Sequence, residues 1–368
     1  MDCPETVLTN DNDYLEKFRL KAVEKRIPVS GSIELTYRCN LRCIHCYLDR
    51  RSNLESTIAR ELTTQQIIAI IDQISDAGCL LLLLTGGEPL SRNDFPEIYQ
   101  HAKKRGLILT VFTNGTLVTD AILELFKALP PYAVEISLYG ASQTTYEKIT
   151  GIKGSYAQCM NGITSLLQHK INVKLKTILM TLNKHEFSEI ENIAKSLGVK
   201  FRFDASISPC LNGNKAPLNL RVFPEEAVEK EFADRERLRL WREYFMRNQE
   251  PLNSDKLYVC SAGLTMFHID PYGKLKPCLS CNEIQYDLSN GDFLSGWHTA
   301  IPKIMEKRVP SNYPCNHCNK VALCNHCPAD AELETGSACI PSEYQCKMAA
   351  YRCHMMYNMS GDTFDERG

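Results

Sequence analysis

The sequence predicts an α/β protein whose main part is a partial (βα)6 barrel of the TIM-like kind, followed by a cysteine-rich, loop-rich domain. From about residue 31 to 205, six short apolar runs alternate with amphipathic stretches of helical period, as in repeated strand-helix units around a parallel sheet. Ten of the 17 cysteines crowd between Cys260 and Cys353, which sets the C-terminal part apart. We expect an N-terminal extension at 1–30, the barrel at 31–205, a linker with a bridging helix at 206–257, and the cysteine-rich domain at 258–368.

The six predicted strands are spaced so that a helix fits between each pair. The second run is apolar throughout, as expected of a strand buried on both faces of a parallel sheet. Ligands of such sheets lie at the carboxyl ends of the strands, so we expect the chemistry in the loops that follow them. The predicted strands cover residues 31–37, 79–85, 107–113, 132–138, 172–180 and 199–205.

Capping signals mark the helices between these strands. Glycines stand where three of the helices should end, at Gly78, Gly106 and Gly198. Capping boxes are expected at Thr63/Gln66, Ser155/Gln158 and Asn183/Glu186. In the segment after the barrel, Leu238, Trp241 and Phe245 line one face of a charged helix, which we expect to pack on the barrel.

Composition excludes several classes of function. The net charge is −2 and no block of Lys or Arg occurs, so we expect neither a nucleic-acid nor a membrane partner. The longest apolar run, Leu80 to Leu84, is too short to span a membrane, and the acidic, polar first residues do not resemble a secretory signal. We therefore expect a cytoplasmic protein whose cysteines bind metal rather than form disulfides.

The sharpest motif follows the first strand and reads Cys39-x3-Cys43-x2-Cys46. Three thiolates hold three irons of a four-iron cluster and leave the fourth iron open to a ligand, whereas a structural zinc site needs four protein ligands. At this point the sequence resembles the radical S-adenosylmethionine (radical SAM) superfamily, whose signature has this spacing and an aromatic or heterocyclic residue before the last cysteine, here His45. The resemblance makes the three cysteines the catalytic cluster ligands.

Further matches to this family fall at the ends of later strands. In the family a GGEP turn after the second strand binds the methionine amino group, and a residue at the end of the fourth strand reaches the ribose. A basic residue beyond the fourth strand meets the cofactor carboxylate, where this chain has a lysine in place of the usual Arg-Gly pair. The resemblance thus assigns cofactor binding to His45, Gly86, Gly87, Glu88, Pro89, Asn114, Ser137 and Lys153.

The resemblance also implies a mechanism. The cluster reduces S-adenosylmethionine to methionine and a 5'-deoxyadenosyl radical, which abstracts hydrogen from a substrate, while the barrel positions the reactive carbon and excludes water. Four polar residues are expected to point into the barrel, where they either bind substrate or pair with one another, and pairing is the simpler interpretation. These residues are Glu135, Lys176, Arg202 and Asp204.

The C-terminal cysteines resemble the SPASM extension, which binds two auxiliary four-iron clusters. Its usual pattern has three residues between the cysteines that match Cys324 and Cys327, whereas this chain has two. With the radical SAM cluster, the resemblance implies three [4Fe-4S] clusters. It assigns Cys315, Cys318, Cys324 and Cys346 to the distal cluster, and Cys260, Cys278 and Cys327 to the nearer one, with Cys281 as a candidate fourth ligand unless that site is open to substrate.

Plainer interpretations remain for several residues. A zinc knuckle is possible for the two C-x2-C pairs, but it leaves the additional cysteines unexplained. Cys210 follows the sixth strand, where a structural role is favoured over hydrogen donation or thiol ligation. We expect Cys79 and Cys159 in the core, Cys339 and Cys353 in packing roles, and His317 and His326 at the surface.

Enzymes with this two-cluster extension mostly act on peptides or proteins, so the resemblance favours oxidative modification of a ribosomally made precursor peptide. About thirty residues precede the first strand, fewer than a leader-binding domain needs, so we expect a separate leader-binding protein or direct recognition of the peptide, and an electron donor such as flavodoxin or ferredoxin. The alternatives are tetrapyrrole side-chain chemistry, sulfatase maturation and, from another class, a non-catalytic iron-sulfur electron carrier or redox sensor.

Overall fold

The computed structural model describes residues 11–48, 60–248 and 254–358. Within them nine strands form one sheet in the order β6-β5-β4-β3-β2-β1-β7-β8-β9. Strands β1 to β7 run parallel, and β8 and β9 add to the edge in antiparallel fashion. The strands are Ser30–Glu34 (β1), Leu81–Thr85 (β2), Ile108–Thr113 (β3), Ala133–Ser137 (β4), Val173–Ile178 (β5), Lys200–Asp204 (β6), Met266–Ile269 (β7), Lys274–Lys276 (β8) and Tyr286–Asp287 (β9).

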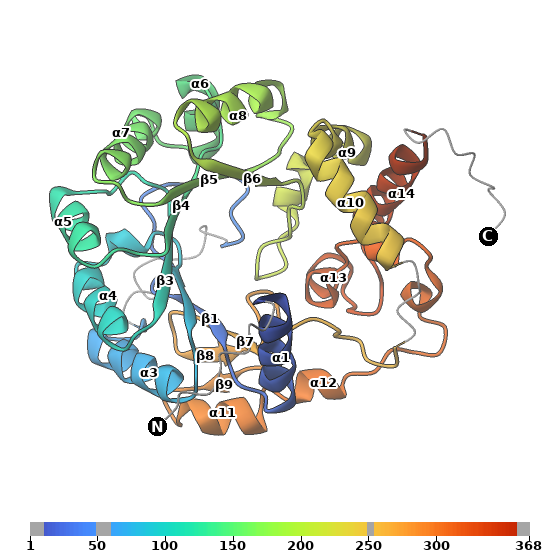
Figure 1. Cartoon of the computed structure of the whole chain (residues 1–368), viewed down its shortest axis with the longest axis horizontal. Coiled ribbons are helices and arrows are strands. Elements are labelled where there is room, and N and C mark those ends of the chain that lie inside the picture. Colours follow the sequence, from blue (N-terminus) through green and yellow to red (C-terminus); the bar gives the residue numbers. More distant parts are fainter. Residues whose placement is uncertain (1–10, 49–59, 249–253, 359–368) are drawn as a thin grey trace, which may run out of the picture.

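The first six strands confirm the predicted partial barrel. The sheet curves, and helices follow its outer face, so that its inner face surrounds the middle of the molecule (Figure 1). Helices in this outer layer are Thr64–Asp76 (α3), Phe95–Lys104 (α4), Asp120–Ala128 (α5), Gln143–Thr150 (α6), Ser155–Gln168 (α7) and Phe187–Ser196 (α8). Side chains alternate along each strand, so buried Leu82 and Leu84 face the helices while their neighbours face inward.

The second strand is not buried on both faces, contrary to the expectation from its apolar sequence. Leu81 is 47% exposed and Leu83 is half-buried, whereas Leu82 and Leu84 are buried. The reason is that helices cover only the outer face of the partial barrel, so the inner face has no second layer of helices over it (Figure 1).

One of the three expected capping boxes forms. The side chain of Thr63 accepts from the Gln66 amide, and the Gln66 side chain accepts from the Thr63 amide, at the start of α3. The other two predictions are wrong: Gly154 is the N-cap of α7 and makes no side-chain cap, and Asn183 instead bonds the backbone around β5. All three helix-ending glycines have left-handed backbone angles, as expected.

Three strands come from the cysteine-rich part, which the sequence analysis did not foresee. Strand β7 pairs with β1 in parallel register, Gly31 opposite Phe267. The Phe267 ring occupies the space above Gly31 and packs edge-on against Phe293 and Trp297 of α11 (Phe293–Thr299). The C-terminal part therefore extends the barrel sheet directly.

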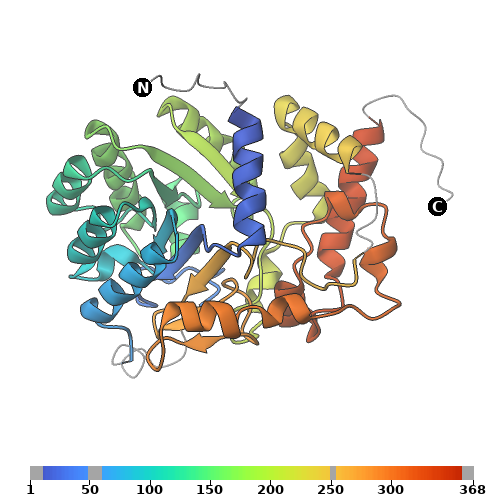
Figure 2. The ribbon, with the colours of Figure 1, turned by 60° about the horizontal axis from the view of Figure 1, so that its bottom comes forward.

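A second core joins the segment after the barrel to the C-terminal helix. Leu238 and Phe245 are buried in it, and the Arg352 guanidinium lies 4.9 Å from the Trp241 ring centroid. The predicted apolar face thus belongs to a core that includes Leu179 and Phe187 of the barrel as well as the C-terminal helix, which lies beside it in two views (Figures 1 and 2). The helices of this part are Pro224–Phe232 (α9), Arg235–Arg247 (α10), Lys303–Glu306 (α12), Pro328–Thr335 (α13) and Glu343–Asn358 (α14).

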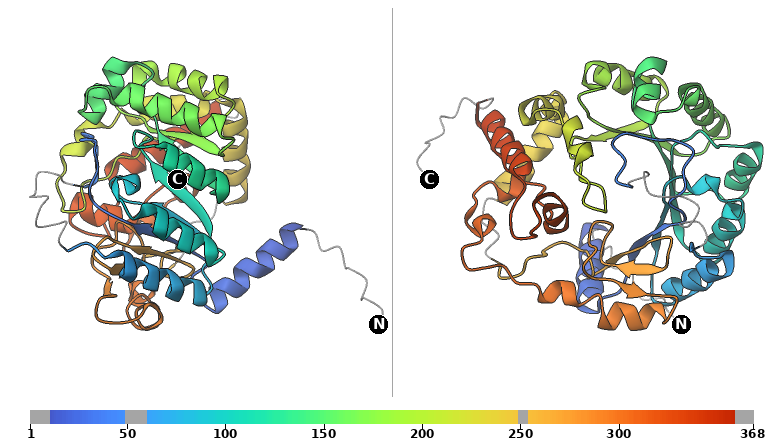
Figure 3. Two further views of the ribbon diagram at one scale, coloured as in Figure 1. Left: turned by 90° about the vertical axis from the view of Figure 1, so that its left-hand side faces the viewer. Right: turned by 180° about the vertical axis from the view of Figure 1, so that it is seen from behind.

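The first helix, α1 (Asp11–Glu24), projects away from the body of the molecule (Figure 3). Among the helices of the described residues, none combines the length and the apolar composition that crossing a membrane requires.

Candidate functional site

A cavity of about 390 Å³ lies at the carboxyl ends of the barrel strands. Residues of the loops after β1, β2, β3, β4 and β6 meet at it, together with the end of β5, as a parallel barrel predicts. Its lining includes most of the residues that the resemblance assigned to the catalytic cluster and the cofactor: Cys39, Cys43, His45, Cys46, Gly86, Gly87, Asn114 and Ser137.

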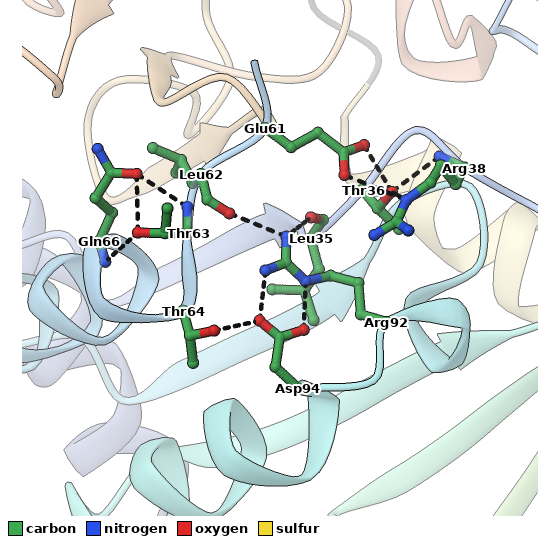
Figure 4. A network of polar contacts seen from close by, with 10 residues as sticks. All are labelled: Leu35, Thr36, Arg38, Glu61, Leu62, Thr63, Thr64, Gln66, Arg92 and Asp94. Carbon is green, nitrogen blue, oxygen red and sulfur yellow. Dashed lines mark hydrogen bonds and ion pairs between the residues drawn. The ribbon is translucent and has the colours of Figure 1, made fainter. Parts of the chain in front are cut away.

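The chain that leads from β1 to the cysteine loop is held by a polar network (Figure 4). Arg92 donates to the Leu35 carbonyl at 2.9 Å and to the Leu62 carbonyl at 3.1 Å, and its other nitrogens pair with Asp94. Glu61 accepts from the Thr36 hydroxyl at 2.6 Å. The network fixes the direction in which the backbone enters the cysteine loop.

The two glycines after β2 touch this same segment. A Cβ on Gly86 would lie 2.3 Å from the Thr36 carbonyl oxygen, and one on Gly87 would lie 2.2 Å from that of Arg38. The Gly87 amide donates to the Thr36 carbonyl at 2.7 Å, and the Glu88 amide donates to Arg38 at 2.8 Å. Glycine is required here because two backbones meet, and the turn is thereby fastened to the segment that carries Cys39.

Glu88 is buried and ties the turn after β2 to the end of β3. Its carboxylate accepts from the Thr113 hydroxyl at 2.7 Å, the Asn114 amide at 2.7 Å and the Leu90 amide at 3.1 Å. Burial raises the pKa of Glu88 to about 7 even though these donors favour the charged form. Neither Glu88 nor Pro89 is among the cavity-lining residues of the described chain, so both stand behind the site.

His45 lies between the second and third cysteines of the motif. Its ring meets Tyr139 edge-on at 4.4 Å between centroids, and burial lowers its pKa to about 4, so the imidazole is neutral at pH 7. The buried Nδ1 atom has no hydrogen-bond partner among the described residues. Burial, followed by Cys43 and more weakly by Cys46 and Cys39, raises the pKa of Tyr139, so all three cysteines lie near this tyrosine.

Asn114 links the ends of β3 and the cysteine loop. Its amide nitrogen donates to Asn40 at 2.9 Å and lies 3.7 Å from the Cys39 sulfur. On the other side of the loop the Arg42 amide donates to the Thr150 carbonyl at 2.8 Å. Lys153 follows this contact closely in the chain, but it is exposed and does not line the cavity.

A buried polar chain beneath the cysteine loop was missed by the sequence analysis. The Tyr47 hydroxyl donates to Glu34 at 2.5 Å, His268 lies 3.1 Å from the other Glu34 oxygen, and Ser32 lies 2.8 Å from His268 Nδ1. Inward positions on β1 are visible in the sequence. However, no local sequence pattern indicates that His268, 234 residues further along the chain, would pair with Glu34.

The inward polar residues of β4 to β6 divide into paired and unpaired groups. Arg202 donates to Glu135 at 2.7 and 3.2 Å, which confirms the pairing interpretation for these two. Lys176 and Asp204 form no ion pair within the described residues, and both line the cavity, as Arg202 also does. The Asp204 carboxylate accepts from the Ser206 amide at 2.7 Å, and the Lys176 amine lies over the Phe112 ring.

Neighbouring C-terminal cysteines influence one another in two groups, one around Cys278 and one around Cys324. Burial raises the pKa of Cys278 to about 12, and the next largest causes include Cys281 and Cys327. Burial likewise raises the pKa of Cys324 to about 11, with smaller effects of Cys346, Cys315 and Cys318. Cys281 is 3% exposed beside Cys278, while Cys260 and Cys346 are exposed.

The remaining cysteines have structural surroundings. Cys79 and Cys159 are buried in the main core and Cys353 in the second, as expected. The Cys210 thiol donates to the Cys46 carbonyl at 3.4 Å, so this cysteine packs against the cysteine loop. Cys339 is half-buried against the main core.

The two histidines beside the C-terminal cysteines differ from each other. His317 is exposed, as expected. The expectation for His326 is wrong, because its Nε2 lies 2.8 Å from the buried Tyr313 hydroxyl and burial lowers its pKa. The ring is turned inward by the short loop between the two neighbouring cysteines.

The donor set suits an iron-sulfur cluster that has one open iron. Three thiols reach one cavity, beside a buried histidine nitrogen that has no hydrogen-bond partner in the described chain. Within the described ranges no three Cys, His, Asp or Glu side chains converge closely enough to hold a single metal ion. No disulfide joins the described cysteines.

Comparisons with known proteins agree with this geometry. The family model described as the radical SAM superfamily matches residues 33–197. The chain is 27% identical to an AdoMet-dependent heme synthase of Methanosarcina barkeri, over 82% of this chain and 92% of that protein. It is 27% identical to the subtilosin biosynthesis protein AlbA of Bacillus subtilis, over 79% of this chain and 67% of that protein. Among solved structures, Streptococcus suis SuiB bound to its precursor peptide SuiA superposes with a TM-score of 0.69 at 16% identity, covering 94% of this chain and 83% of SuiB.

Proposed function

Because this chain belongs to the radical SAM superfamily, in its SPASM-domain subgroup, and is therefore an enzyme that uses S-adenosylmethionine and a four-iron cluster, we propose that it oxidatively modifies a ribosomally made precursor peptide. The main observation in support of this proposal is that the three cysteines of the motif line the same cavity as the glycine pair and the β4 serine. These residues are Cys39, Cys43, Cys46, Gly86, Gly87 and Ser137. A pure electron carrier needs no such cofactor pocket.

Cys39, Cys43 and Cys46 are the proposed ligands of the radical SAM cluster. When bound, the cluster and S-adenosylmethionine supply a 5'-deoxyadenosyl radical that abstracts a hydrogen atom from the substrate. The protein's part is to fix the cysteine loop, through Arg92 and the Gly86-Gly87 turn, and to keep the cavity walls in place.

The cofactor pocket is formed by four groups with different tasks. Gly86 and Gly87 offer backbone where a side chain would intrude, and Ser137 offers a hydroxyl at the end of β4. Asn114 holds the cysteine loop through Asn40, and the unpartnered His45 Nδ1 is available to the cofactor. We propose a supporting role for Glu88 and Pro89, because they lie behind this surface.

Two auxiliary four-iron clusters are proposed for the C-terminal cysteines. The distal set is Cys315, Cys318, Cys324 and Cys346, whose neighbouring thiols affect one another's pKa values. For the nearer set, the burial of Cys281 beside Cys278 favours Cys281 as the fourth ligand, with Cys260 and Cys327.

The proposed peptide substrate is supported by the similarity to AlbA and by the shared fold of SuiB, whose structure contains a precursor peptide. A separate leader-binding protein and a flavodoxin or ferredoxin donor are proposed as partners. Tetrapyrrole modification is the second candidate, because the match to the heme synthase extends over 92% of that protein.

Cofactor chemistry is tested on protein reconstituted with iron and sulfide without oxygen. Three four-iron clusters correspond to about twelve irons per chain. Reduced protein should release 5'-deoxyadenosine from S-adenosylmethionine, and the C43A variant should lose about four irons and all release. C79A is the matched control, because Cys79 lies in the core away from the cavity and its loss should leave release intact. Equal release by C43A and wild type would contradict the proposal.

The substrate is tested separately by mass spectrometry. The reduced enzyme is incubated with a peptide encoded beside its gene, or with Fe-coproporphyrin III, in parallel samples. A peptide that loses two hydrogens or gains a cross-link supports the leading candidate. A change in the mass of the tetrapyrrole alone favours the second candidate and rejects the first.

A further inference from the structure

Three polar side chains stand at one level of the inner face, on adjacent strands. Ser137 of β4 is in register with Lys176 of β5, which is in register with Arg202 of β6. All three line the cavity that also holds the cysteine loop. The Lys176 side chain extends past β4 toward β3, where its amine lies 2.9 Å from the centroid of the Phe112 ring.

The charges at this level do not cancel within the described chain. Glu135 accepts both bonds from Arg202 and also lies 3.9 Å from the Lys174 amine. Asp204 stands one level further along and accepts the Ser206 amide. In the residues that the structure describes, no carboxylate lies within ion-pair distance of the Lys176 amine. The cavity therefore contains an amine for which these residues supply no anionic partner.

We infer that Lys176, with the Ser137 hydroxyl beside it, is the receptor for a ligand carboxylate in the cavity. The inference rests on the proposed function, since the two possible sources are the methionine carboxylate of S-adenosylmethionine and a carboxylate of the substrate. Lys153, the residue first expected to meet the cofactor carboxylate, is exposed and outside the cavity. Lys176 can take that part, because the other basic group of the cavity, Arg202, is already bonded to Glu135.

The electrostatic surroundings of Lys176 agree with this assignment. Burial, and then the charge of Arg202, lower its pKa well below the ordinary value, while Glu135 and Glu88 act in the opposite direction. The amine therefore loses its proton easily when no anion is near. A bound carboxylate restores the ammonium form and gains a charge-assisted hydrogen bond in a site of low dielectric.

The first test measures how fast Lys176 is acetylated by sulfo-N-hydroxysuccinimide acetate, followed by peptide mass spectrometry on the reconstituted holoprotein. Four samples are compared: no addition, S-adenosylmethionine, decarboxylated S-adenosylmethionine, and glutarate as a simple carboxylate probe. Slower labelling of Lys176 with S-adenosylmethionine, but not with its decarboxylated form, identifies the cofactor as the source. If glutarate slows the labelling of Lys176, while S-adenosylmethionine and its decarboxylated form have equal effects, the source is a carboxylate of the substrate. Lys153, labelled in the same samples, is the exposed control.

The inference is overturned if no carboxylate slows the labelling of Lys176 more than the carboxylate-free compound does. That result leaves the proposed function standing, provided that wild-type protein binds S-adenosylmethionine. Failure of wild-type protein to bind the cofactor would reject the proposed function itself.

The second test uses affinity. K176M should weaken binding of the carboxylate ligand identified above by roughly 10- to 100-fold, and K176R should recover part of it. K174M is the matched control, because Lys174 lies two residues earlier on the same strand and does not line the cavity, so affinity should stay within about twofold. Equal affinities in K176M and K174M would refute a receptor role, and circular dichroism verifies that both variants fold.

Discussion

At the scale of single residues, several members of the motif after β2 hold the turn and the cysteine loop together. Glu88 was expected to meet the cofactor, yet it accepts three hydrogen bonds from the ends of neighbouring elements. Gly87 lines the cavity, and its lack of a side chain also lets the backbone of Arg38 lie against it. A motif therefore identifies where a site lies, whereas only the structure shows which of its members line the cavity.

Glu88 makes the stability of the protein depend on pH. Its pKa is about 7 in the folded protein against an ordinary value near 4.5, so the folded state binds the proton more tightly than the unfolded state does. The stabilisation is complete below pH 4.5 and is lost as the pH rises through 7. At its full size, below pH 4.5, this stabilisation amounts to about 3 kcal/mol.

We expect the thermal midpoint of wild-type protein to fall between pH 5.5 and pH 8 more steeply than that of E88Q, whose side chain does not titrate. Differential scanning calorimetry under anaerobic conditions measures both slopes. Groups common to the two proteins cancel in the difference. Parallel curves would show that Glu88 titrates normally.

The Gly87 contact is tested by adding one methyl group. G87A places a Cβ 2.2 Å from the Arg38 carbonyl oxygen, a backbone atom that cannot turn aside. G106A is the control, because its Cβ meets nothing within 4 Å and only its left-handed backbone angle is strained, at a cost of about 1–2 kcal/mol. We expect G87A to lower the thermal midpoint further than G106A and to weaken S-adenosylmethionine binding, which G106A leaves unchanged. Equal effects would mean that the turn can move away from the cysteine loop.

At the scale of elements, local patterns predicted the six barrel strands because each alternates with a helix of clear period. Strand β7 was not predicted, because the four residues Met266–Ile269 are too short a run to be distinguished from the surrounding turns and cysteines. The cysteine triplet and the glycine pair were predictable from spacing. The meeting of Glu34 with His268, and of Lys176 with Phe112, was not, because closure of the sheet creates these contacts between distant segments.

The join between β1 and β7 depends on a glycine and an aromatic ring. G31A would place a Cβ 2.1 Å from the Phe267 ring, which is itself held by Phe293 and Trp297. We expect G31A to destabilise the protein by about 1–3 kcal/mol through overpacking. In the background F267L, where the ring is gone, the same change should cost at least about 1 kcal/mol less. Urea unfolding of the four proteins in this cycle measures the coupling, and additive effects would contradict the packing described.

At the scale of the whole molecule, the barrel and the cysteine-rich part are joined on two sides. On one side the sheet continues from β1 into β7. On the other, Arg221 pairs with Glu334 of α13 through bonds of 2.9 and 2.7 Å, and also donates to the Ile207 carbonyl at 2.9 Å. The segment between Ile207 and Arg221 lines the cavity at its start, so the second join bears directly on the site.

Breaking that second join should loosen one wall of the cavity without unfolding the barrel. Both side chains of the Arg221–Glu334 pair are largely buried, at 11% and 16% exposure, so E334Q leaves a cation without its counter-ion, a loss of about 3–5 kcal/mol when such a pair is fully buried. Hydrogen exchange followed by mass spectrometry should show faster exchange in residues 206–221 of E334Q, with exchange in β2 to β4 unchanged. E343Q is the control, since the Glu343–Lys347 pair is exposed and contributes less than about 1 kcal/mol. If 206–221 exchanges at the same rate in E334Q and E343Q, the cavity wall is held by the barrel alone and the C-terminal part does not shape the site.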